Sequence, residues 1–415
     1  MDGGKPKIIY LSPQCPYPPT DGGKISIYFP VLYLSKYFSV RLVFPVDSLA
    51  DKESMKDHFR SFGVQVSYFQ KSTRGFFVDL KNLMLNFGEE LPFKWRKYYC
   101  KNAQRLINEI ALREKVDVVL VSSPHMMKYA LGVKQVKPDV KIFLREHNVE
   151  YSLVEQFGRL VKNPLYKAVA LWQLEKSRRV EVGYWKLADR VFFISDGDYE
   201  VALSAAPQLS DKFRVVYDGC EIKSEEVPKV DNSDFIYTAN LNTIQNEISF
   251  RWFIEKVWMP NLPFVKRENI KIYVTGNSQE VLRRKLRRYG SLKELNVENL
   301  GFLDNLEEET RRYKYVLSPT IIGSGIRFKL LNGMACGKPV FATPLDVNTT
   351  KHFKDMENVV CFEDSESFVK KLKYLENNQD MYHSISKNAI ETIKKHFTWE
   401  NYAECVYREY LEAVS

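Results

Sequence analysis

Short apolar segments rich in β-branched residues recur along the chain, each separated from the next by a helical stretch or a loop. Their apolar character is continuous rather than alternating, which is typical of strands buried on both faces of a parallel sheet. Strands that alternate with helices indicate an α/β fold. These segments are 7–12, 40–45, 116–123, 140–148, 188–195, 213–219, 235–240, 270–276, 297–302, 313–320 and 338–344.

A polar stretch at 221–234, with two charge clusters and a proline, interrupts this pattern and is typical of an interdomain linker. The strand and helix pattern restarts after it. We therefore expect two parallel-sheet α/β domains in tandem, at 1–225 and 226–395. Residues 396–415 place aromatic and apolar side chains close to helical spacing, so we expect a final helix that packs outside the second sheet.

Composition narrows the class of protein. The chain has 415 residues, 45% hydrophobic and 27% charged, which is typical of a globular protein of two or three domains. It holds no apolar run long enough to span a membrane and no signal-peptide pattern, so we expect a cytoplasmic protein. Its six cysteines form no CxxC pair, which argues against a disulfide framework or a structural zinc site.

The formal charge of +9 favours anionic partners, without choosing among nucleotides, phospholipid head groups and nucleic acid. Nucleic acid is disfavoured, because no recognised nucleic-acid-binding module accompanies the basic residues.

Two loops after predicted strands hold residues suited to ligand contact, since ligands of open parallel sheets bind beyond the carboxyl ends of the strands. Prolines stiffen the loop at 12–26, and Gly22 and Gly23 precede a helix, where backbone N–H groups can approach an anion or a sugar. His147 follows another strand and titrates near neutral pH. The alternative interpretations are a rigid surface turn and a structural histidine.

Asp196 and Asp198 form a DxD pair directly after the strand at 188–195. Such a pair can hold Mg²⁺ or Mn²⁺ against a diphosphate, because hard cations prefer carboxylate oxygens. Acidic residues also favour a helix N-terminus, and Ser195 or Asp196 is a suitable N-cap. We favour the capping interpretation and predict no metal site.

The segment 318–344 is predicted to be a strand, a glycine turn, a helix and a strand, and it contains no carboxylate. Gly323 and Gly325 allow a tight turn, and a helix is expected to begin directly after them with its N–H groups exposed. Arg327 and Lys329 then lie in the first helical turn, against the helix dipole. This placement indicates a bound polyanion such as a diphosphate; the alternative is a solvated basic helix face.

In this order the motifs resemble the retaining glycosyltransferases of the GT-B fold, most closely family 4. The resemblance covers essentially the whole chain, through "DGG", "REHNVEY", "ADRVFFISDGD", "VVYDGCEI", "NLGFLDNLEEE", "SGIRFKLLNGMACGKPVFAT" and "FTWENY". Most of these motifs are weak alone, and their order is specific. The resemblance implies two Rossmann-like domains that face each other across a cleft, with the helix at 396–415 crossing back to the first domain.

The resemblance also implies catalytic roles. His147 matches a histidine near the donor sugar and its leaving phosphate. Arg327 and Lys329 match the basic pair of a GxGxRxK sequence. Other relatives place this pair just after the first strand of the second domain, but here the segment 239–249 contains no arginine or lysine.

Further residues match parts of the family's substrate site. Two glycines match the loop that faces the donor diphosphate and the acceptor, one glycine matches a turn after the second strand, and a Phe-Leu pair matches the segment near the nucleotide base. The residues implied in substrate binding are Gly22, Gly23, Gly276, Phe302, Leu303, Ser324, Gly325, Ile326 and Asn332.

The sequence departs from the family at two of these positions. Relatives usually carry two glutamates eight residues apart, one facing the donor sugar and one the ribose, where this chain has Ser324 and Asn332. Asn332 can still bond ribose hydroxyls, although neutral partners form hydrogen bonds roughly half as strong as charged ones. The change alters donor choice, weakens binding or abolishes activity.

The function implied is a metal-independent, retaining hexosyl transfer from a UDP-, GDP- or dTDP-linked sugar to a saccharide or lipid-linked acceptor, without a cofactor. The product would be a cell-surface polysaccharide or glycolipid. The alternatives are a sugar-nucleotide epimerase or hydrolase on the same fold, and a non-catalytic binding subunit with a degenerate donor site.

The segment 91–106 interleaves basic residues with Phe93, Trp95, Tyr98 and Tyr99. On an interfacial surface such residues attract anionic lipid and insert aromatic rings, which would suit a lipid-linked acceptor at the inner face of the membrane. The alternative is a basic connecting helix. The basic run "RRKLRR" is interpreted as a solvated helix face.

Overall fold

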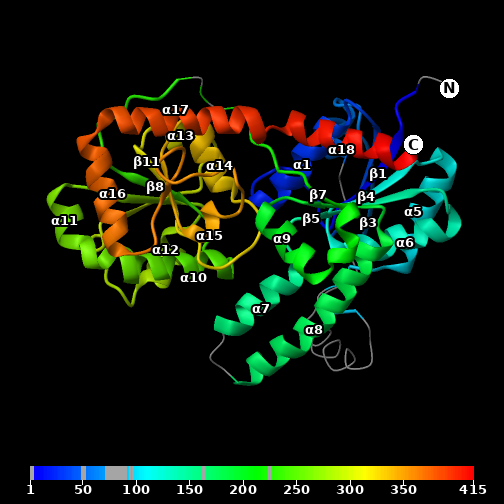
Figure 1. Cartoon of the computed structure of the whole chain (residues 1–415), viewed down its shortest axis with the longest axis horizontal. Helices are drawn as coiled ribbons and strands as arrows, with labels where there is room; N and C mark the ends of the chain where they lie inside the picture. The colour runs from blue at the N-terminus through cyan, green and yellow to red at the C-terminus, as the bar shows by residue number, and fades with distance from the viewer. Residues whose placement is uncertain are drawn as a thin grey trace. The chain divides into compact units, whose positions relative to one another are not determined.

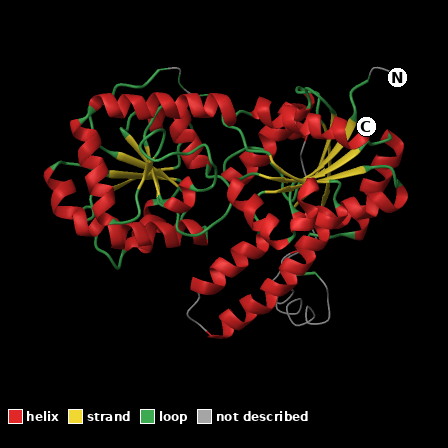
Figure 2. Cartoon of the chain, viewed as in Figure 1, coloured by secondary structure: helices red, strands yellow, loops and turns green. Residues whose placement is uncertain are grey.

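The chain forms two compact units, each with one parallel β-sheet between layers of helices (Figures 1 and 2). One unit comprises Met1–Tyr217 and Trp399–Ser415, and the other comprises Asp218–Thr398. These two sheets confirm the predicted α/β fold class. The structure, a computed structural model, describes residues 4–47, 53–70, 91–92, 95, 98–160, 164–222, 224 and 226–415.

The sheet of the first unit has seven strands in the order β3-β2-β1-β4-β5-β6-β7, and all described pairs are parallel. Its elements are β1 (Lys7–Leu11), α1 (Gly22–Leu34), β2 (Ser39–Val46), α2 (Glu53–Arg60), β3 (Gln65–Gln70), α5 (Lys101–Glu114), β4 (Val118–Val121), α6 (Met127–Val136), β5 (Lys141–Glu146), α7 (Glu150–Leu160), α8 (Pro164–Leu187), β6 (Arg190–Phe193), α9 (Asp196–Ala205), β7 (Phe213–Val215) and α18 (Trp399–Val414).

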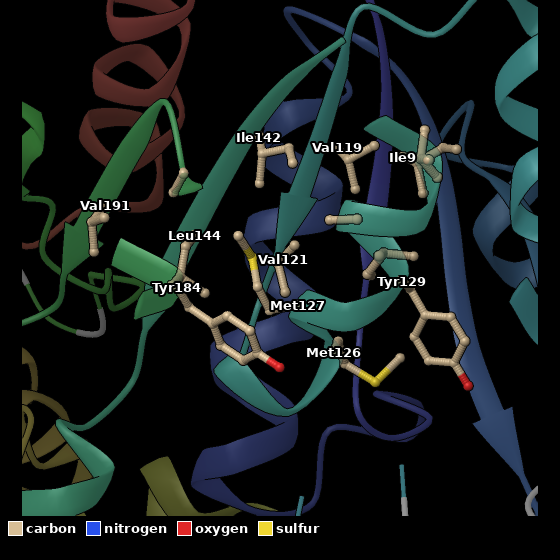
Figure 3. Packing of buried hydrophobic residues seen from close by; sticks show 14 of the residues in the cluster. Ile9, Val119, Val121, Met126, Met127, Tyr129, Ile142, Leu144, Tyr184 and Val191 are labelled. Carbon is tan, nitrogen blue, oxygen red and sulfur yellow. The ribbon is translucent and has the colours of Figure 1, made fainter. Parts of the chain in front are cut away.

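The central strands of this sheet supply the core. Alternate residues of β1, β4 and β5 point to one face and pack against the start of α6 (Figure 3). The residues between them are buried on the opposite face, which explains why the strands are continuously apolar. Each large side chain that becomes buried contributes about 1.5–3 kcal/mol relative to an exposed one. The residues on the first face include Ile9, Val119, Val121, Met127, Tyr129, Ile142 and Leu144.

The last helix, α18, packs beside α1 within the first unit (Figure 1). Trp399 stacks on Phe29 of α1 with the ring centroids 5.5 Å apart. Further along the helix, the nearly buried Glu409 accepts a hydrogen bond from Nε of Arg190 and one from Nε of Arg214, both at 2.7 Å. These arginines lie on β6 and β7, so one carboxylate joins the helix to two neighbouring strands.

The sheet of the second unit has six parallel strands in the order β10-β9-β8-β11-β12-β13. Helices α10 and α12 lie on one face, and α14 and α17 lie on the other (Figure 1). Its elements are β8 (Phe235–Thr238), α10 (Ile244–Phe253), a π-helical turn (Ile254–Trp258), α11 (Leu262–Arg267), β9 (Ile272–Thr275), α12 (Gln279–Leu286), β10 (Val297–Gly301), α13 (Leu306–Arg311), β11 (Tyr315–Ser318), α14 (Phe328–Ala335), β12 (Val340–Ala342), α15 (Pro344–Val347), β13 (Val360–Cys361), α16 (Ser365–Asn377) and α17 (Gln379–His396).

Helices in the described part of the chain are either too short or too polar to cross a lipid bilayer.

We predict that Glu409→Ala lowers the free energy of unfolding by about 1–3 kcal/mol, because two largely buried guanidinium groups lose their shared acceptor. Equilibrium urea unfolding followed by tryptophan fluorescence measures the change. The matched control is Glu412→Ala, whose carboxylate is 62% exposed and 3.9 Å from the same arginines, and which should change stability by less than about 0.5 kcal/mol. Equal effects of the two substitutions would contradict the assignment.

Candidate functional site

Each sheet has a point at which the strand order reverses, between β1 and β4 in the first sheet and between β8 and β11 in the second. Loops leave such neighbouring strands in opposite directions, and ligands of this fold class bind beside them. The loop after β1 leads to Gly22, and the predicted glycine turn follows β11. The glycine loop before α1 and the glycine turn after β11 therefore lie beside the reversal points of their own sheets, whereas His147 follows β5.

In the first unit, the structure brings His147 to the first turns of α1. Nδ1 of His147 lies 2.9 Å from Oγ of Ser26, and Nε2 lies 2.9 Å from a terminal nitrogen of Arg145. A guanidinium can only donate, so Nε2 accepts and carries no proton. Burial, and then the charge of Arg145, lower the pKa of His147 well below its ordinary value. His147 is therefore a neutral group, suited to positioning rather than to carrying a positive charge.

Arg145 holds this arrangement from inside the unit. It is fully buried, and it donates to the backbone carbonyl of Ser26 at 2.6 Å and to Oγ of Ser26 at 2.9 Å. The ring of Tyr402 from α18 lies 5.1 Å from its guanidinium. Gly22 and Gly23 begin α1 one turn before Ser26, and the side chain of Asp21 caps the helix by accepting from Lys24 N–H. Arg145 thus holds both His147 and the start of α1, which follows the glycine loop.

The carboxylates of the DxD pair accept hydrogen bonds from neighbouring side chains. Oγ of Ser195 donates to Asp198 at 2.6 Å, and the hydroxyl of Tyr217 donates to Asp196 at 2.8 Å. Ser195 is also the N-cap of α9, where its side chain accepts from Asp198 N–H. Within the described ranges, no group of three or more histidine, cysteine, aspartate or glutamate side chains could hold a metal ion.

In the second unit, Arg327 lies beneath the glycine turn. Gly323 and Gly325 have φ of +142° and +74°, which favour glycine. One terminal nitrogen of Arg327 donates to the carbonyl of Ser324 at 2.7 Å, and Nε donates to Oδ1 of Asp346 at 3.2 Å. The other terminal nitrogen is buried and has no hydrogen-bond partner among the described residues.

The close approach of Arg327 also explains why position 323 is a glycine. A Cβ added at Gly323 would lie 2.1 Å from the guanidinium nitrogen that lacks a partner. The helix after the turn begins at Phe328, with Arg327 as its N-cap residue, rather than directly after Gly325. Because Arg327 has extended backbone geometry, with φ −95° and ψ 116°, its side chain points back under the turn.

Lys329, in the first turn of α14, reaches toward α10. Its ammonium lies 3.3 Å from Oδ1 of Asn246 and 4.7 Å from the centre of the Tyr237 ring. Burial lowers the pKa of Lys329 to about 8; Asp346 opposes this shift and Arg327 adds to it. Lys329 therefore places a positive charge beside the segment 239–249, which itself contains no basic residue.

Three other predicted residues lie at the carboxyl ends of β9 and β10. Gly276, with φ of +86°, donates its N–H to the carbonyl of Gly301 at 2.8 Å, and a Cβ there would meet the carbonyl oxygen of Ala239 at 3.2 Å. Phe302 is 77% exposed, the most exposed large hydrophobic side chain in the described chain, and Leu303 is half-buried. An exposed aromatic ring at this edge is suited to stacking on a flat ligand group.

The remaining predicted residues belong to the glycine turn and to α14. Ser324 is half-buried, Gly325 is buried, and Ile326 is 6% exposed and packs inward. Oδ1 of Asn332 accepts from the thiol of Cys220 at 3.0 Å. The side chain that we expected to bond a ribose thus already makes one hydrogen bond within the second unit.

Of the two interpretations of the segment 91–106, insertion of aromatic rings into a lipid surface is wrong for Trp95, and Tyr98 and Tyr99 are half-buried. Trp95 is 4% exposed and stacks on Tyr184 at 5.8 Å, and Tyr99 packs against the buried Tyr129 at 5.2 Å. These rings complete the core of the first unit. Phe93 lies outside the described residues.

Sequence reasoning missed the groups that hold the predicted side chains. Arg145 and Ser26 support His147, and Asp346 contacts Arg327. A weak signal was present, since Arg145 directly follows the apolar residues 142–144 of a strand and Asp346 closely follows another strand. The second unit therefore combines two fixed cations, a helix N-terminus and an exposed aromatic ring, an arrangement suited to a polyanion that carries a flat group.

Residues 232–378 match the model of the family described as Glycosyl transferases group 1. The matched segment includes every predicted site residue of the second unit. The chain is also 24% identical over 416 residues to a protein described as "Uncharacterized 44.6 kDa protein in cps region" of Klebsiella pneumoniae, with 97% of this chain and 99% of that protein covered.

Solved structures show the same fold. Sucrose-phosphate synthase from Thermosynechococcus elongatus matches with a TM-score of 0.70 at 14% identity, covering 99% of this chain and 100% of that chain. The Anabaena protein Alr3699/HepE in complex with UDP matches with a TM-score of 0.66 at 13% identity, covering 98% and 100%. Together with the family match, they confirm the predicted resemblance to GT-B glycosyltransferases.

The titration of Lys329 leads to a prediction. Its ammonium is lost as the pH rises through about 8, whereas an ordinary lysine keeps its charge to about 10.5. A terminal phosphate is fully ionised above about pH 7. We predict that the affinity for a nucleoside diphosphate falls about 3- to 10-fold between about pH 7.5 and about pH 9.5, as measured by isothermal titration calorimetry.

Two variants test this assignment. Lys329→Met should bind the nucleoside diphosphate weakly and with little dependence on pH over this range. Lys370→Met removes an exposed lysine of α16 and should keep the pH dependence of the wild type. An unchanged pH dependence in Lys329→Met would show that another group titrates.

Proposed function

We propose that the chain, whose residues 232–378 match the glycosyl transferases group 1 model, is a glycosyltransferase that moves a sugar from a nucleoside diphosphate to a saccharide or lipid-linked acceptor. The transfer retains the anomeric configuration and uses no metal ion. The observation that carries this proposal is the buried nitrogen of Arg327 that lies against Gly323 without a partner among the described residues. A phosphate oxygen is the acceptor that such a donor fits.

The chemistry follows from where charge develops. As the bond between the anomeric carbon and the diphosphate breaks, negative charge grows on the departing phosphate. Arg327, Lys329 and the N–H groups at the start of α14 stabilise that charge more strongly than the ground state, which lowers the barrier. Asp346 and the carbonyl of Ser324 hold Arg327, and Asn246 contacts Lys329, before any substrate binds.

The acceptor hydroxyl attacks the anomeric carbon from the face that the diphosphate leaves, and its proton passes to the departing phosphate oxygen. This path needs no covalent enzyme intermediate. His147 is neutral, and both of its ring nitrogens are bonded within the first unit, to Arg145 and Ser26. Its role in this proposal is therefore to position the start of α1, which follows the loop of Gly22 and Gly23, rather than to act as a cation or a nucleophile.

Two relatives support particular parts of the proposal. The Anabaena protein was solved with UDP and with UDP-glucose, which favours a uridine nucleotide as the first donor to test. The Klebsiella pneumoniae relative is described as lying in a cps region, which favours a role in capsule or other surface polysaccharide synthesis. The acceptor is then a growing saccharide or its lipid-linked precursor.

A second candidate function is a non-catalytic binding subunit. The observation that favours it is the side chain of Asn332, whose amide oxygen is bonded to Cys220 and which stands where relatives have a glutamate. Such a protein would bind nucleotide sugars without turning them over.

The test is to incubate the protein with UDP-, GDP- and dTDP-linked sugars, with and without saccharide or lipid-linked acceptors, and to measure nucleotide release. The proposal predicts release that depends on an acceptor. Release without an acceptor would indicate a hydrolase or epimerase, and binding without release would indicate the binding subunit.

Variants then assign the roles. Arg327→Gln should lower transfer by about 100-fold or more, since a donor aimed at developing charge is lost. The control Arg284→Gln removes an exposed arginine of α12 and should transfer at the wild-type rate. His147→Ala should also lower transfer, and a rate close to the wild type would remove His147 from the mechanism.

A further inference from the structure

A buried carboxylate lies beside the two cations of the second unit. Asp346 has no exposed surface, and it follows β12 in the short helix α15. Its Oδ1 accepts from Nε of Arg327 at 3.2 Å, and its Oδ2 accepts from Oγ of Ser318 at the end of β11. Burial raises the pKa of Asp346, while Arg327 and the Ser318 hydroxyl oppose that rise.

A carboxylate at an anion site presents a conflict. It repels a bound phosphate, so simple electrostatics predicts that its removal would strengthen anion binding. It also holds one edge of the guanidinium, and loss of that hold would let the side chain leave its position. Which effect dominates depends on how the guanidinium is held.

The three nitrogens of Arg327 are held differently. Nε is bound by Asp346, one terminal nitrogen is bound by the carbonyl of Ser324, and the other lies against Gly323 with no partner among the described residues. By bonding Nε, Asp346 therefore holds the guanidinium in the orientation in which its free terminal nitrogen faces the glycine turn. If the carboxylate of Asp346 instead bonded Nε and the free terminal nitrogen together, no donor of Arg327 would be left for a phosphate.

Asp346 is itself fixed by two strands. Ser318 ends β11, and the backbone N–H of Asp346 donates to the carbonyl of Thr343, which follows β12, at 3.0 Å. The carboxylate thus transfers the rigidity of the sheet to the side chain of Arg327. A long, flexible arginine held in this way loses less conformational entropy when it binds a phosphate.

We propose that Asp346 is a positioning residue for the anion site, and that its hold on Arg327 outweighs its repulsion of the bound phosphate. The identification of the anion as the diphosphate of a sugar donor rests on the proposed function. The positioning of Arg327 by Asp346 does not rest on the proposed function, so an experiment can reject either claim without rejecting the other.

The first experiment needs no ligand. Arginine side chains react with phenylglyoxal, and mass spectrometry of the peptide that contains Arg327 gives its rate of labelling. We expect Asp346→Asn and Asp346→Ala to label Arg327 several-fold faster than the wild type, because the side chain is released. The matched control is Asp380→Asn, which removes an exposed carboxylate of α17 in the same unit and should leave the rate unchanged.

The second experiment measures the affinity for inorganic pyrophosphate and for UDP by calorimetry. We expect about tenfold weaker binding in Asp346→Ala, with Asp346→Asn intermediate, because asparagine keeps an acceptor but loses the charge. Asp346→Ala should have no further effect in a chain that also carries Arg327→Met, since it acts through that arginine. Circular dichroism shows whether each variant is folded.

The outcomes separate the possibilities. Unchanged labelling of Arg327 in both Asp346 variants would overturn the proposal, whatever the protein binds. Equal or tighter binding of pyrophosphate or UDP by both folded variants would also overturn it, because repulsion would then dominate. Faster labelling and weaker binding, in a wild type that transfers no sugar, would support the positioning role and reject the transferase function.

Discussion

Parallel pairing of the strands determines where this protein can place chemical groups. In a parallel sheet every strand ends at the same edge, and the loops of neighbouring strands separate only where the strand order reverses. In the second sheet this happens between β8 and β11, so the glycine turn after β11 lies near the loop after β8. Lys329 contacts Asn246 across that reversal. The position of the candidate site follows from the topology of the sheet.

Electrostatic balance then decides what that position can hold. Two cations at the start of a helix oppose its dipole, and burial makes each of them costly unless a partner is present. Asp346 partly neutralises Arg327, and the reduced pKa of Lys329 shows the cost that remains. A bound diphosphate would relieve both. Asp346 therefore supplies only part of the negative charge that would balance Arg327 and Lys329, and a bound polyanion would supply the rest.

The apolar strands and the two parallel sheets could be predicted from the sequence, because burial on both faces leaves a continuous apolar pattern. The edge strands β3 and β13 were missed, since Gln65–Gln70 mixes polar and apolar residues and Val360–Cys361 is very short, and each strand pairs on one side only. The glycine turn was also predictable, because two glycines separated by one residue, directly before a helical pattern, are typical of a tight turn at a helix start. The basic pair that follows the glycines could be read from the same segment.

The contacts that hold the site could not be predicted. Asp346 lies 19 residues beyond Arg327 in the chain, and only the sheet brings them together. The burial of Trp95 could not be predicted either, because composition alone cannot tell a ring that faces lipid from a ring that faces the core. Local patterns indicate which residue types are present, whereas tertiary contacts decide which atoms remain available.

The central claim is that the second unit binds a nucleoside diphosphate through the buried nitrogen of Arg327. A crystal structure of the protein in complex with UDP tests it most directly. The account predicts a phosphate oxygen within hydrogen-bonding distance of that nitrogen and of the N–H groups at the start of α14, with Asp346 still bound to Nε. A diphosphate bound elsewhere, or an Arg327 side chain that makes no contact with phosphate, would contradict it.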